Sequence, residues 1–368
     1  AHLGFPVLVR PSYVLGGRAM EIIYNESDLE KYLEEAVKVS NEHPVLVDRY
    51  YVGKEVEVDA ICDGKDVLIP GIMEHLERAG VHSGDSIAIY PPQTLEQRHI
   101  DTIVDYTKKL ALSLNVKGLV NIQFVIHDGE VFTIEVNPRA SRTVPFLSKV
   151  TGIPMVKLAT RIMLGETLES MGCETGYAKP KDLVAIKMPV FSFNKLVGVE
   201  PSLGPEMKST GEVMGLDVDF ASALHKAFLG AGYRIPEKGA VLATVSDKDK
   251  AEALPLMKKF TDLGFTIWAT SGTADFLEAN GVEVKRVAKI GHGSPNVIDL
   301  IHNKEVDFVV NSLTKGKQPQ RDGFQIRRSA VEFNIPCMTS LDTCRGLLEV
   351  IERCQAEDVK VKALQEYV

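Results

Sequence analysis

The fold of this chain is decided by the stretch VFTIEVNPR, which covers residues 131–139. Its apolar start follows the turn dipeptide Asp128-Gly129, so the pattern predicts the second strand of a hairpin. Glu135 and Asn137 alternate along that strand, and side chains two residues apart point to the same face of a sheet. A carboxylate and an amide oxygen on one face are hard ligands, which suit Mg²⁺ or Mn²⁺ carrying nucleotide phosphates.

Further polar residues are expected beside this pair. Gln123 lies on the partner strand, residues 120–124, and offers another oxygen. Arg139 and Arg142 follow directly after Pro138 ends the strand. A metal with guanidinium groups beside it is how a phosphoryl-transfer site holds the group in transit. An isolated Glu-x-Asn at a strand end is more often a solvated edge than a metal site. Here the two arginines and an upstream glycine-rich loop favour the metal site, because all of them fit one chemistry.

The composition is that of a globular protein with two or three domains. The chain has 368 residues, of which 45% are hydrophobic and 25% charged, and these values are ordinary for folded domains. The net charge of -8 argues against nucleic-acid binding. The sequence holds no run of about 18 apolar residues, so no membrane span is expected.

The cysteines and the start of the chain indicate the compartment and the extent of the protein. Five cysteines are scattered without the short spacing of a zinc site. They favour a reducing compartment with thiols used as small apolar residues, and we expect a cytoplasmic location. The chain begins at Ala1 without methionine or a signal peptide and soon enters an apolar run, which indicates a piece of a longer protein.

The first 60 residues predict a small sheet with a phosphate-binding loop. A strand at 5–11 carries Arg10, and Gly16-Gly17 follow in a loop before the next strand at 20–24. Paired glycines can fold backbone N–H groups over phosphates, although they are most often a plain hairpin turn. The spacing Ser27-x-x-Glu30 predicts a capping box that opens a helix.

Three later stretches are ambiguous between core and ligand contact. The strand at 45–51 is either plain core or the lining of an adenine pocket. The strand at 55–60 alternates, with its acids on one face that is solvated or holds a ribose hydroxyl. His82, in a loop of small and polar residues, is either a general base or a contact to ligand or backbone. A second capping box, Thr94-x-x-Gln97, predicts another helix.

From Ala240 onward, strands and helices alternate, which predicts a mostly parallel sheet with any ligand at the carboxyl ends of its strands. The expected strands are 241–245, 265–269, 282–284, 308–311 and 336–338. The sequence Thr270-Ser271-Gly272-Thr273 begins a helix and is a natural anion site. Basic residues that follow other strands favour a phosphorylated ligand over a merely solvated face: Lys289, Lys315, Lys317, Arg321, Arg327 and Arg328.

Three motifs together resemble the large subunit of carbamoyl phosphate synthetase. They are VRPSYVLGG at 9–17, GVHSGDS at 80–86 and EVNPRASRTVPF at 135–146. The similarity is to its second, carbamoyl-phosphate-forming ATP-grasp unit, and the terminal part resembles the methylglyoxal-synthase-like (MGS-like) allosteric domain of the same enzyme. The resemblance covers essentially the whole chain.

The resemblance implies an α/β and α+β fold, in which a partial ATP-grasp fold precedes a doubly wound parallel-sheet, MGS-like domain. The implied domains are the C-terminal part of a carbamoyl-phosphate-forming ATP-grasp domain at 1–175, a connector with a helix at 176–238 and the MGS-like allosteric domain at 239–368. The implied reaction is ATP-dependent phosphorylation of carbamate to carbamoyl phosphate, for pyrimidine and arginine biosynthesis.

The family's site residues map onto this sequence position by position. The metal ligands would be Gln123, Glu135 and Asn137, for Mg²⁺ or Mn²⁺, with K⁺ as a further cation. Catalytic roles fall on Arg139 and Arg142, which would clamp carbamate and the transferring phosphoryl group, and on Glu135. The ATP-binding residues would be Arg10, Gly16, Gly17, Arg49, Tyr51, Glu55, Gly80, Val81, His82, Ser83, Gln123 and Glu135.

Regulatory residues map in the same way. A nucleotide effector, UMP or IMP, would contact Lys250, Thr270, Thr273, Lys289 and Asn311. Thr339, Glu77 and Asp85 fall near the family's ornithine-responsive site, and Thr339 is counted with the effector residues. Met188 stands where the ornithine-activated pattern has a glutamate, which weakens the expected response to a cationic amino acid. The 312–317 loop holds no acid, so no methylglyoxal synthase activity is expected.

The resemblance also implies partners and leaves alternatives. The partners would be a glutaminase small subunit that delivers ammonia, the remainder of the large subunit and the nucleotide effector, within an oligomer. One alternative is a catalytically incomplete fragment that acts only as an allosteric effector-binding module. Another is an ATP-grasp ligase for a different carboxylate.

Overall fold

The structure is a computed structural model, and it describes all residues except 1–2, 13–16, 18, 40–43, 197, 313–321, 357–358 and 368. Chain contacts divide it into two compact units. Unit 1 comprises Ala1–Pro189, Gly204–Asp219 and Lys362–Val368, and unit 2 comprises Val190–Leu203 and Phe220–Val361. The chain therefore leaves unit 1 for a short excursion into unit 2, returns, and then enters unit 2 again.

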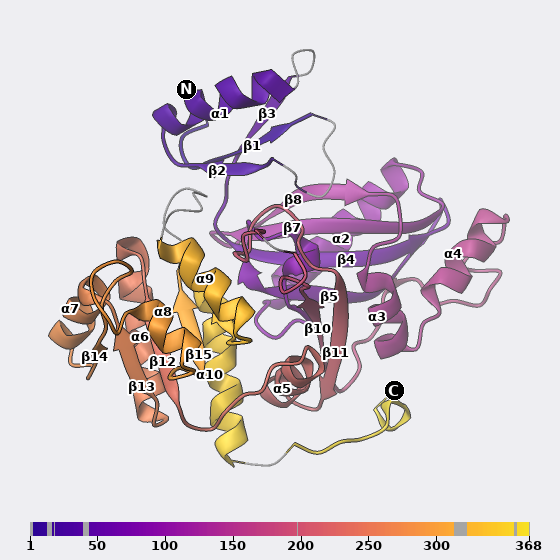
Figure 1. Cartoon of the computed structure of the whole chain (residues 1–368). Coiled ribbons are helices and arrows are strands. Elements are labelled where there is room, and N and C mark those ends of the chain that lie inside the picture. Colours follow the sequence, from indigo (N-terminus) through magenta and orange to yellow (C-terminus); the bar gives the residue numbers. More distant parts are fainter. Residues whose placement is uncertain are drawn as a thin grey trace. The chain divides into compact units, whose positions relative to one another are not determined.

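Unit 1 begins with a small antiparallel sheet in the order β2-β1-β3. Its strands are β1 (Val7–Pro11), β2 (Glu21–Ile23) and β3 (Val45–Arg49), and helix α1 (Glu26–Val39) packs beside them (Figure 1). The apolar residues that alternate along the strands face the helix. Their cluster contains Val7, Val9, Ile23 and Tyr32.

A large antiparallel sheet forms the body of unit 1, with the order β11-β10-β6-β5-β4-β7-β8 in the described residues. Its central strands are β4 (Lys54–Cys62), β5 (Val67–Arg78), β7 (Gly118–His127) and β8 (Glu130–Asn137). The other strands are β6 (Ala88–Tyr90), β10 (Val184–Val190), β11 (Gly211–Asp217) and β9 (Gly176–Tyr177), which pairs with β5 in parallel. Short 3₁₀ turns span Ser83–Asp85 and Leu364–Glu366.

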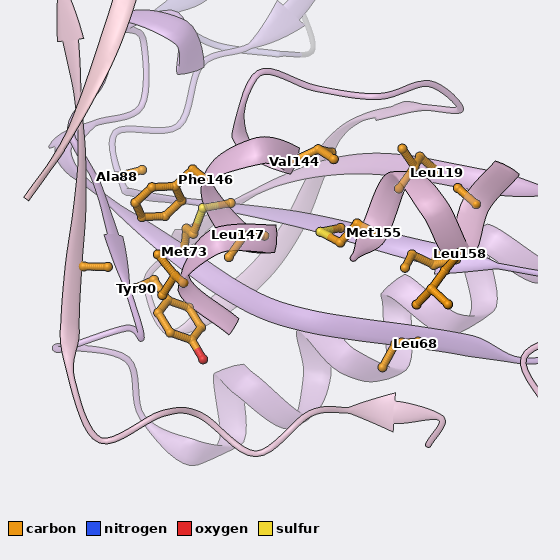
Figure 2. Packing of buried hydrophobic residues seen from close by; sticks show 14 of the residues in the cluster. Leu68, Met73, Ala88, Tyr90, Leu119, Val144, Phe146, Leu147, Met155 and Leu158 are labelled. Atoms are coloured by element: carbon orange, nitrogen blue, oxygen red, sulfur yellow. The ribbon is translucent and has the colours of Figure 1, made fainter. Parts of the chain in front are cut away.

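Each face of this sheet carries its own hydrophobic core. Helix α2 (Gln97–Ser113) covers one face, where Val56, Val58 and Ile103 lie in a single cluster. Helices α3 (Thr143–Thr151) and α4 (Met155–Met163) cover the other face. Figure 2 shows Phe146 and Leu147 of α3 beside Met73 and Tyr90. Strand β4 is thus buried on both faces, and this burial decides the character of the site below.

Unit 2 is built on a parallel sheet in the order β14-β13-β12-β15-β16. The strands are β12 (Ala240–Thr244), β13 (Thr266–Ala269), β14 (Lys285–Arg286), β15 (Phe308–Asn311) and β16 (Cys337–Met338). The chain builds outward from β12 in both directions, which is a doubly wound arrangement. The expected fold class is confirmed.

Helices surround this sheet (Figure 1). They are α5 (Phe220–Gly230), α6 (Lys250–Asp262), α7 (Ser271–Ala279), α8 (Val297–His302), α9 (Asp322–Glu332) and α10 (Leu341–Ala356), with a 3₁₀ turn at Asp247–Asp249. Leu242 of the sheet shares a cluster with Leu300 of α8 and Ile326 of α9. In the described part of the chain, no helix combines the length and the hydrophobicity that a bilayer crossing requires.

Several local expectations were wrong. Helix α1 begins two residues earlier than expected, because Asn25 rather than Ser27 caps it and accepts from the backbone N–H of Asp28 at 2.9 Å. Thr94 caps nothing, because its N–H and hydroxyl both donate to Glu74 at 3.0 Å.

Three longer segments also differ from expectation. The strand expected at 282–284 lies at Lys285–Arg286. The sequence also predicts a short helix near Leu168, but the residues there form a turn. The range 176–238, expected to be a connector, contains β10 and β11, which extend the large sheet. The proline and glycine residues between those strands suggested a connector. Instead, β10 pairs with β6, which is distant in the sequence, and β11 lies next to β10 in the sheet.

Candidate active site

Two neighbouring strands bring the predicted metal ligands together. Gln123 of β7 faces Glu135 of β8 in register, and Asn121 faces Asn137. The amide nitrogen of Asn137 donates to Oε1 of Glu135 at 2.8 Å, and that of Gln123 donates to Oγ of Ser83 at 2.9 Å. Since the amide nitrogens are used in these bonds, the amide oxygens are the atoms that can face a cation.

This donor set fits a hard divalent cation. One carboxylate and two amide oxygens are the ligand types that Mg²⁺ accepts, with water and phosphate oxygens completing its shell. Among the residues that the structure describes, no group of three or more His, Cys, Asp or Glu side chains is arranged to hold a metal. The predicted set does not depend on such a group, because Glu135 is its one acidic member.

The acids of β4 are buried, in contrast to the solvated face that is usual for such a strand. Glu55, Glu57 and Asp59 are 4%, 3% and 1% exposed. The amide of Asn121 donates to Oε1 of Glu57 at 2.7 Å and to Oδ1 of Asp59 at 3.2 Å. The hydroxyls of Ser141 and Thr143, at the start of α3, both donate to Oδ2 of Asp59. This network joins the floor of the site to the segment that carries Arg142.

Sequence reasoning missed Glu57, Asp59, Asn121 and Thr143 as members of the site. Strict alternation along β4 put the acids on one face but gave no sign that α3 covers it. The valines that alternate with these acids are the usual pattern of a strand with one solvated face, so the sequence of β4 carried no signal that both of its faces are buried.

His75 lies between two of these carboxylates. Its Nε2 is 3.4 Å from Oε2 of Glu57, and its Nδ1 is 3.5 Å from Oε1 of Glu55 without hydrogen-bond geometry. Burial raises the pKa of Glu55 to about 7; His75 opposes this shift, whereas Glu57 and Glu135 reinforce it. Burial also raises the pKa of Asp59, and the carboxylate of Glu57 adds to this effect.

Glu55→Gln is expected to stabilise the free protein at high pH. A carboxyl group whose pKa is about 7 when folded and 4.5 unperturbed binds a proton on folding between those pH values. The unfolding free energy of the wild type therefore falls as pH rises from 4.5 to 7, and the glutamine variant escapes this fall. We expect a gain on the order of 1 kcal/mol at pH 8 and close to none at pH 5, measured by urea unfolding. An equal gain at both pH values would contradict a buried, protonated Glu55.

The loop at 80–86 forms one wall of the site. Gly80 has a φ of 108°, and a Cβ there would lie 2.6 Å from Oη of Tyr50, so only glycine fits. Val81 follows it, and Nδ1 of His82 accepts from the N–H of Gly84 at 3.0 Å. Burial lowers the pKa of His82. His82 is therefore a neutral ring whose Nδ1 is already engaged, which favours its role as a ligand or backbone contact over a general base.

Lys187 of β10 holds the 80–86 loop through hydrogen bonds to its backbone. The sequence alone did not predict this role. The Lys187 side chain is 1% exposed. Nζ donates to the carbonyl oxygens of Ser83 at 3.1 Å and Ser86 at 2.7 Å. Burial lowers the pKa of Lys187, and the carboxylate of Glu57 opposes that shift.

The two predicted arginines stand at the start of α3 with exposed side chains. Nη1 of Arg142 donates to Oγ of Ser209 at 2.9 Å. The backbone N–H groups of Lys208 and Ser209 donate in turn to the carboxylate of Asp85, both at 2.8 Å. Nη1 of Arg139 donates to the carbonyl of Ala140 at 3.1 Å. Arg142 is thus oriented by Ser209, whose backbone is held by Asp85. The hydrogen bond described for Arg139 lies within its own segment.

The remaining ATP-binding candidates lie on or next to the small sheet, and Gly16 lies outside the described residues. Nε of Arg10 is 3.4 Å from Oδ2 of Asp48. The Arg49 guanidinium lies 5.3 Å from the centre of the Tyr51 ring, which stacks on Phe132 of β8 at 4.6 Å. Tyr51 therefore joins this region to the strand of the metal ligands.

Gly17 makes a close backbone approach that requires glycine. Its φ is 69°, and a Cβ would lie 1.8 Å from the carbonyl oxygen of Pro205. The glycine-rich loop and the segment around residue 205 can pack at this distance only because no side chain intervenes.

The predicted effector residues of unit 2 follow the carboxyl ends of its parallel strands. Thr270 and Thr273 follow β13, Lys289 follows β14, Asn311 ends β15 and Thr339 follows β16. Lys250 begins α6 beyond β12, and its Nζ donates to the carbonyl of Gly272 at 2.6 Å. This common edge is where α/β sheets bind ligands. Lys315, Lys317 and Arg321 lie outside the described residues.

Besides Lys250, the side chains of Thr273 and Asn311 are already hydrogen bonded inside unit 2. The hydroxyl of Thr273 accepts from the N–H of Val245 at 3.2 Å. The amide of Asn311 donates to Oγ1 of Thr244 at 2.7 Å and accepts from Arg327. Asn311 and Thr273 are buried, whereas Lys289 is exposed.

Two family models match the sequence. Residues 1–171 match the model described as the carbamoyl-phosphate synthase L chain, ATP binding domain. Residues 252–339 match the model of the MGS-like domain. The chain thus carries a region that matches an ATP-binding domain, followed by a region that matches an MGS-like domain.

Solved structures with weak similarity are biotin carboxylases. The enzyme of Campylobacter jejuni is 20% identical, with 51% of this chain and 42% of that chain covered and a TM-score of 0.44. The biotin carboxylase domain of the Hydrogenobacter thermophilus 2-oxoglutarate carboxylase, solved with MgADP, ADP and bicarbonate, is 19% identical, with coverages of 62% and 57% and a TM-score of 0.48. The chain spans about half the length of these solved chains.

Proposed function

We propose that this chain phosphorylates carbamate with ATP to give carbamoyl phosphate and ADP, as part of a carbamoyl phosphate synthetase. The observation that carries the proposal is the grouping of Gln123, Glu135 and Asn137, within a region that matches the ATP-binding domain of that synthase. Gln123 contacts Ser83, and Arg142 is joined through Ser209 to the neighbouring Gly84, so the same loop connects both parts of the site. The order of the two matched domains also supports it.

The side chains of the site divide the work of phosphoryl transfer. Mg²⁺ or Mn²⁺, when bound, would neutralise charge on the phosphate oxygens. Glu135, Gln123 and Asn137 would hold that ion, and the 80–83 loop with Gly17 would hold the nucleotide. Arg142 and Arg139 would clamp carbamate and the group in transit. Carbamate is a weak and unstable nucleophile, so positioning and charge neutralisation must supply most of the rate enhancement.

K⁺ is proposed as a further cation in the same region. The carboxylates of Glu57, Glu77 and Asp85 are buried and interact with the buried ammonium group of Lys187. A monovalent cation beside these buried carboxylates would lower the free-energy cost of keeping them ionised away from solvent. ATP formation would then depend on K⁺ and fall when Na⁺ replaces it.

The reaction is tested most directly in reverse. The chain is mixed with MgADP and carbamoyl phosphate, and ATP formation is followed, which avoids the need for unstable carbamate. ATP that depends on both substrates and on the divalent cation is the expected result. Bicarbonate or other carboxylates accepted in place of carbamate in the forward direction would instead indicate a different ATP-grasp ligase.

We also propose a nucleoside monophosphate as an effector of unit 2. The edge formed by the carboxyl ends of its strands supports this, because it gathers Thr270, Lys250 and Lys289. A glutaminase subunit, the remainder of the large subunit and an oligomeric assembly, all in the cytoplasm, belong to the same proposal. If the chain binds effector but forms no ATP, the second candidate function applies, in which it acts as an effector-binding module alone.

Lys289→Ala is expected to weaken UMP or IMP binding by about tenfold, because an exposed ammonium near a phosphate contributes on the order of 1 kcal/mol. Calorimetric titration of wild type and variant measures this. Lys285→Ala is the matched control, since Lys285 is also exposed and lies over the Trp268 ring. Equal weakening in both variants would indicate general electrostatics, and no weakening in Lys289→Ala would remove Lys289 from the site.

A further inference from the structure

One segment of the chain, residues 200–209, is anchored at both ends by polar contacts, and we call it the strap. Its second half belongs to unit 1. The carbonyl of Gly204 accepts from the N–H of His82 at 2.8 Å, and Asp85 accepts from the N–H groups of Lys208 and Ser209. The hydroxyl of Ser209 accepts from Arg142 and donates to the carbonyl of Gly84 at 2.9 Å. The strap thus orients a proposed catalytic arginine.

The first half of the strap belongs to unit 2 and is held there by a buried ion pair. Nε and Nη2 of Arg327 on α9 donate to Oε1 and Oε2 of Glu200, at 2.7 and 2.8 Å. The two side chains are 9% and 14% exposed. Glu200 Oε1 also accepts from the N–H of Ser202 at 3.0 Å, so the carboxylate fixes the backbone that follows it.

The same guanidinium contacts a predicted effector residue. Nη1 of Arg327 donates to Oδ1 of Asn311 at 2.5 Å. A bidentate Arg–carboxylate pair has a fixed planar geometry, so a shift of the guanidinium must be followed by the carboxylate. Any ligand that changes the position of the Asn311 amide therefore acts on Glu200.

The segment that precedes the strap in the chain also contacts α9. Nη1 of Arg328 donates to the carbonyls of Phe193 and Leu196, at 3.0 and 3.1 Å. Asn194 donates to Asn334 at 2.9 Å. The segment just before the strap is thus fastened to Arg328 of α9 and to Asn334 in the turn that follows this helix.

We propose that the strap couples the anion site of unit 2 to the orientation of Arg142, with Arg327 as the positioning residue that holds its unit 2 end. Each set of contacts lies within one unit, and the peptide chain between Glu200 and Ser209 joins them. The inference rests on the effector role proposed above. It goes further by naming the segment and the ion pair through which that effector acts.

The test measures coupling between two binding events instead of turnover. If the two sites are coupled, UMP changes the affinity for MgADP and MgADP changes the affinity for UMP by the same factor. MgADP is titrated calorimetrically into the whole chain with and without saturating UMP, and a parallel series uses IMP. In the wild type we expect at least about a fivefold change in the dissociation constant with one of the two nucleotides.

Glu200→Gln removes the charge that pairs with Arg327 and keeps the shape of the side chain. We expect UMP itself to bind within about twofold of wild type and the effect on MgADP to shrink to less than about twofold. The control is Glu352→Gln, which breaks an exposed pair with Lys259 elsewhere in unit 2 and should keep the full coupling. Hydrogen exchange at the amides of Lys208 and Ser209 gives a second readout, which should respond to UMP in the wild type and not in Glu200→Gln.

The outcomes separate the inference from the proposed function. Absence of MgADP binding in the wild type overturns the proposed function and the inference with it. MgADP binding that neither nucleotide changes overturns the inference alone. The failure of both nucleotides to bind overturns the proposed effector role together with the inference. Full coupling in a folded Glu200→Gln variant overturns the role of the ion pair. If Glu200→Gln fails to fold, Ser209→Ala tests the other end of the strap, and undiminished coupling in that variant overturns the inference.

Discussion

Replacing Glu135 with glutamine is expected to reduce ATP formation from MgADP and carbamoyl phosphate by at least about 100-fold. The substitution keeps the volume and the hydrogen bond from Asn137, but it removes the one carboxylate among the proposed metal ligands. The divalent cation then loses its anionic ligand, and its binding should weaken as well. Raising the Mg²⁺ concentration should restore part of the rate, which separates a metal ligand from a purely structural residue.

Glu130→Gln is the matched control for this experiment. Glu130 lies on the same strand, β8, but is exposed at its other end beside the hairpin turn. We expect this variant to keep the wild-type rate and metal dependence. Normal ATP formation by Glu135→Gln, or an equal loss in Glu130→Gln, would show that the metal site lies elsewhere.

Arg142→Lys is expected to lower the rate of ATP formation by about 100-fold and to leave the affinity for MgADP nearly unchanged. Lysine keeps the positive charge, but it cannot hold Ser209 and an anionic substrate at once with the planar fork of a guanidinium. The loss should therefore appear in the turnover number and in the affinity for carbamoyl phosphate.

Arg98→Lys supplies the control for Arg142→Lys. Arg98 is an exposed arginine on α2, paired with Glu96 at 2.8 Å, and has no proposed part in the reaction. We expect its substitution to change neither rate nor affinity. A loss of MgADP affinity in Arg142→Lys without loss of turnover would move Arg142 from the transferring group to the nucleotide.

The hairpin that carries the predicted metal ligands could be predicted from the sequence, because it depends on neighbouring residues. The turn at Asp128-Gly129 sets the pairing as far as Phe124 opposite Thr133, and a bulge beside that pair then shifts the register by one residue, which puts Gln123 opposite Glu135. The parallel sheet of unit 2 was equally predictable, because alternating strands and helices leave few other arrangements. The roles of these residues stay predictions, while their placement side by side is observed.

The parts that were not predicted depend on contacts between distant segments. Lys187 reads as an ordinary residue in an apolar run, and only the pairing of β10 with β6 puts it beneath the 80–86 loop. Ser209 lies in a stretch without regular pattern, yet it meets Arg142 because Asp85 fixes the backbone there. The alternation of acids and apolar residues along β4 did not reveal that the acids are buried. The helix that covers them, α3, begins more than 80 residues later in the sequence.

The route of the chain through the two units has a consequence for protein engineering. Because residues 190–203 belong to unit 2 while their neighbours on both sides belong to unit 1, unit 2, for which we propose the effector role, is made from two separate stretches of the chain. A hybrid that exchanges only residues 239–368 with those of a relative would set a foreign α9 against the native Glu200. Transplanting the response to a different effector should therefore require two grafts, one of them only 14 residues long.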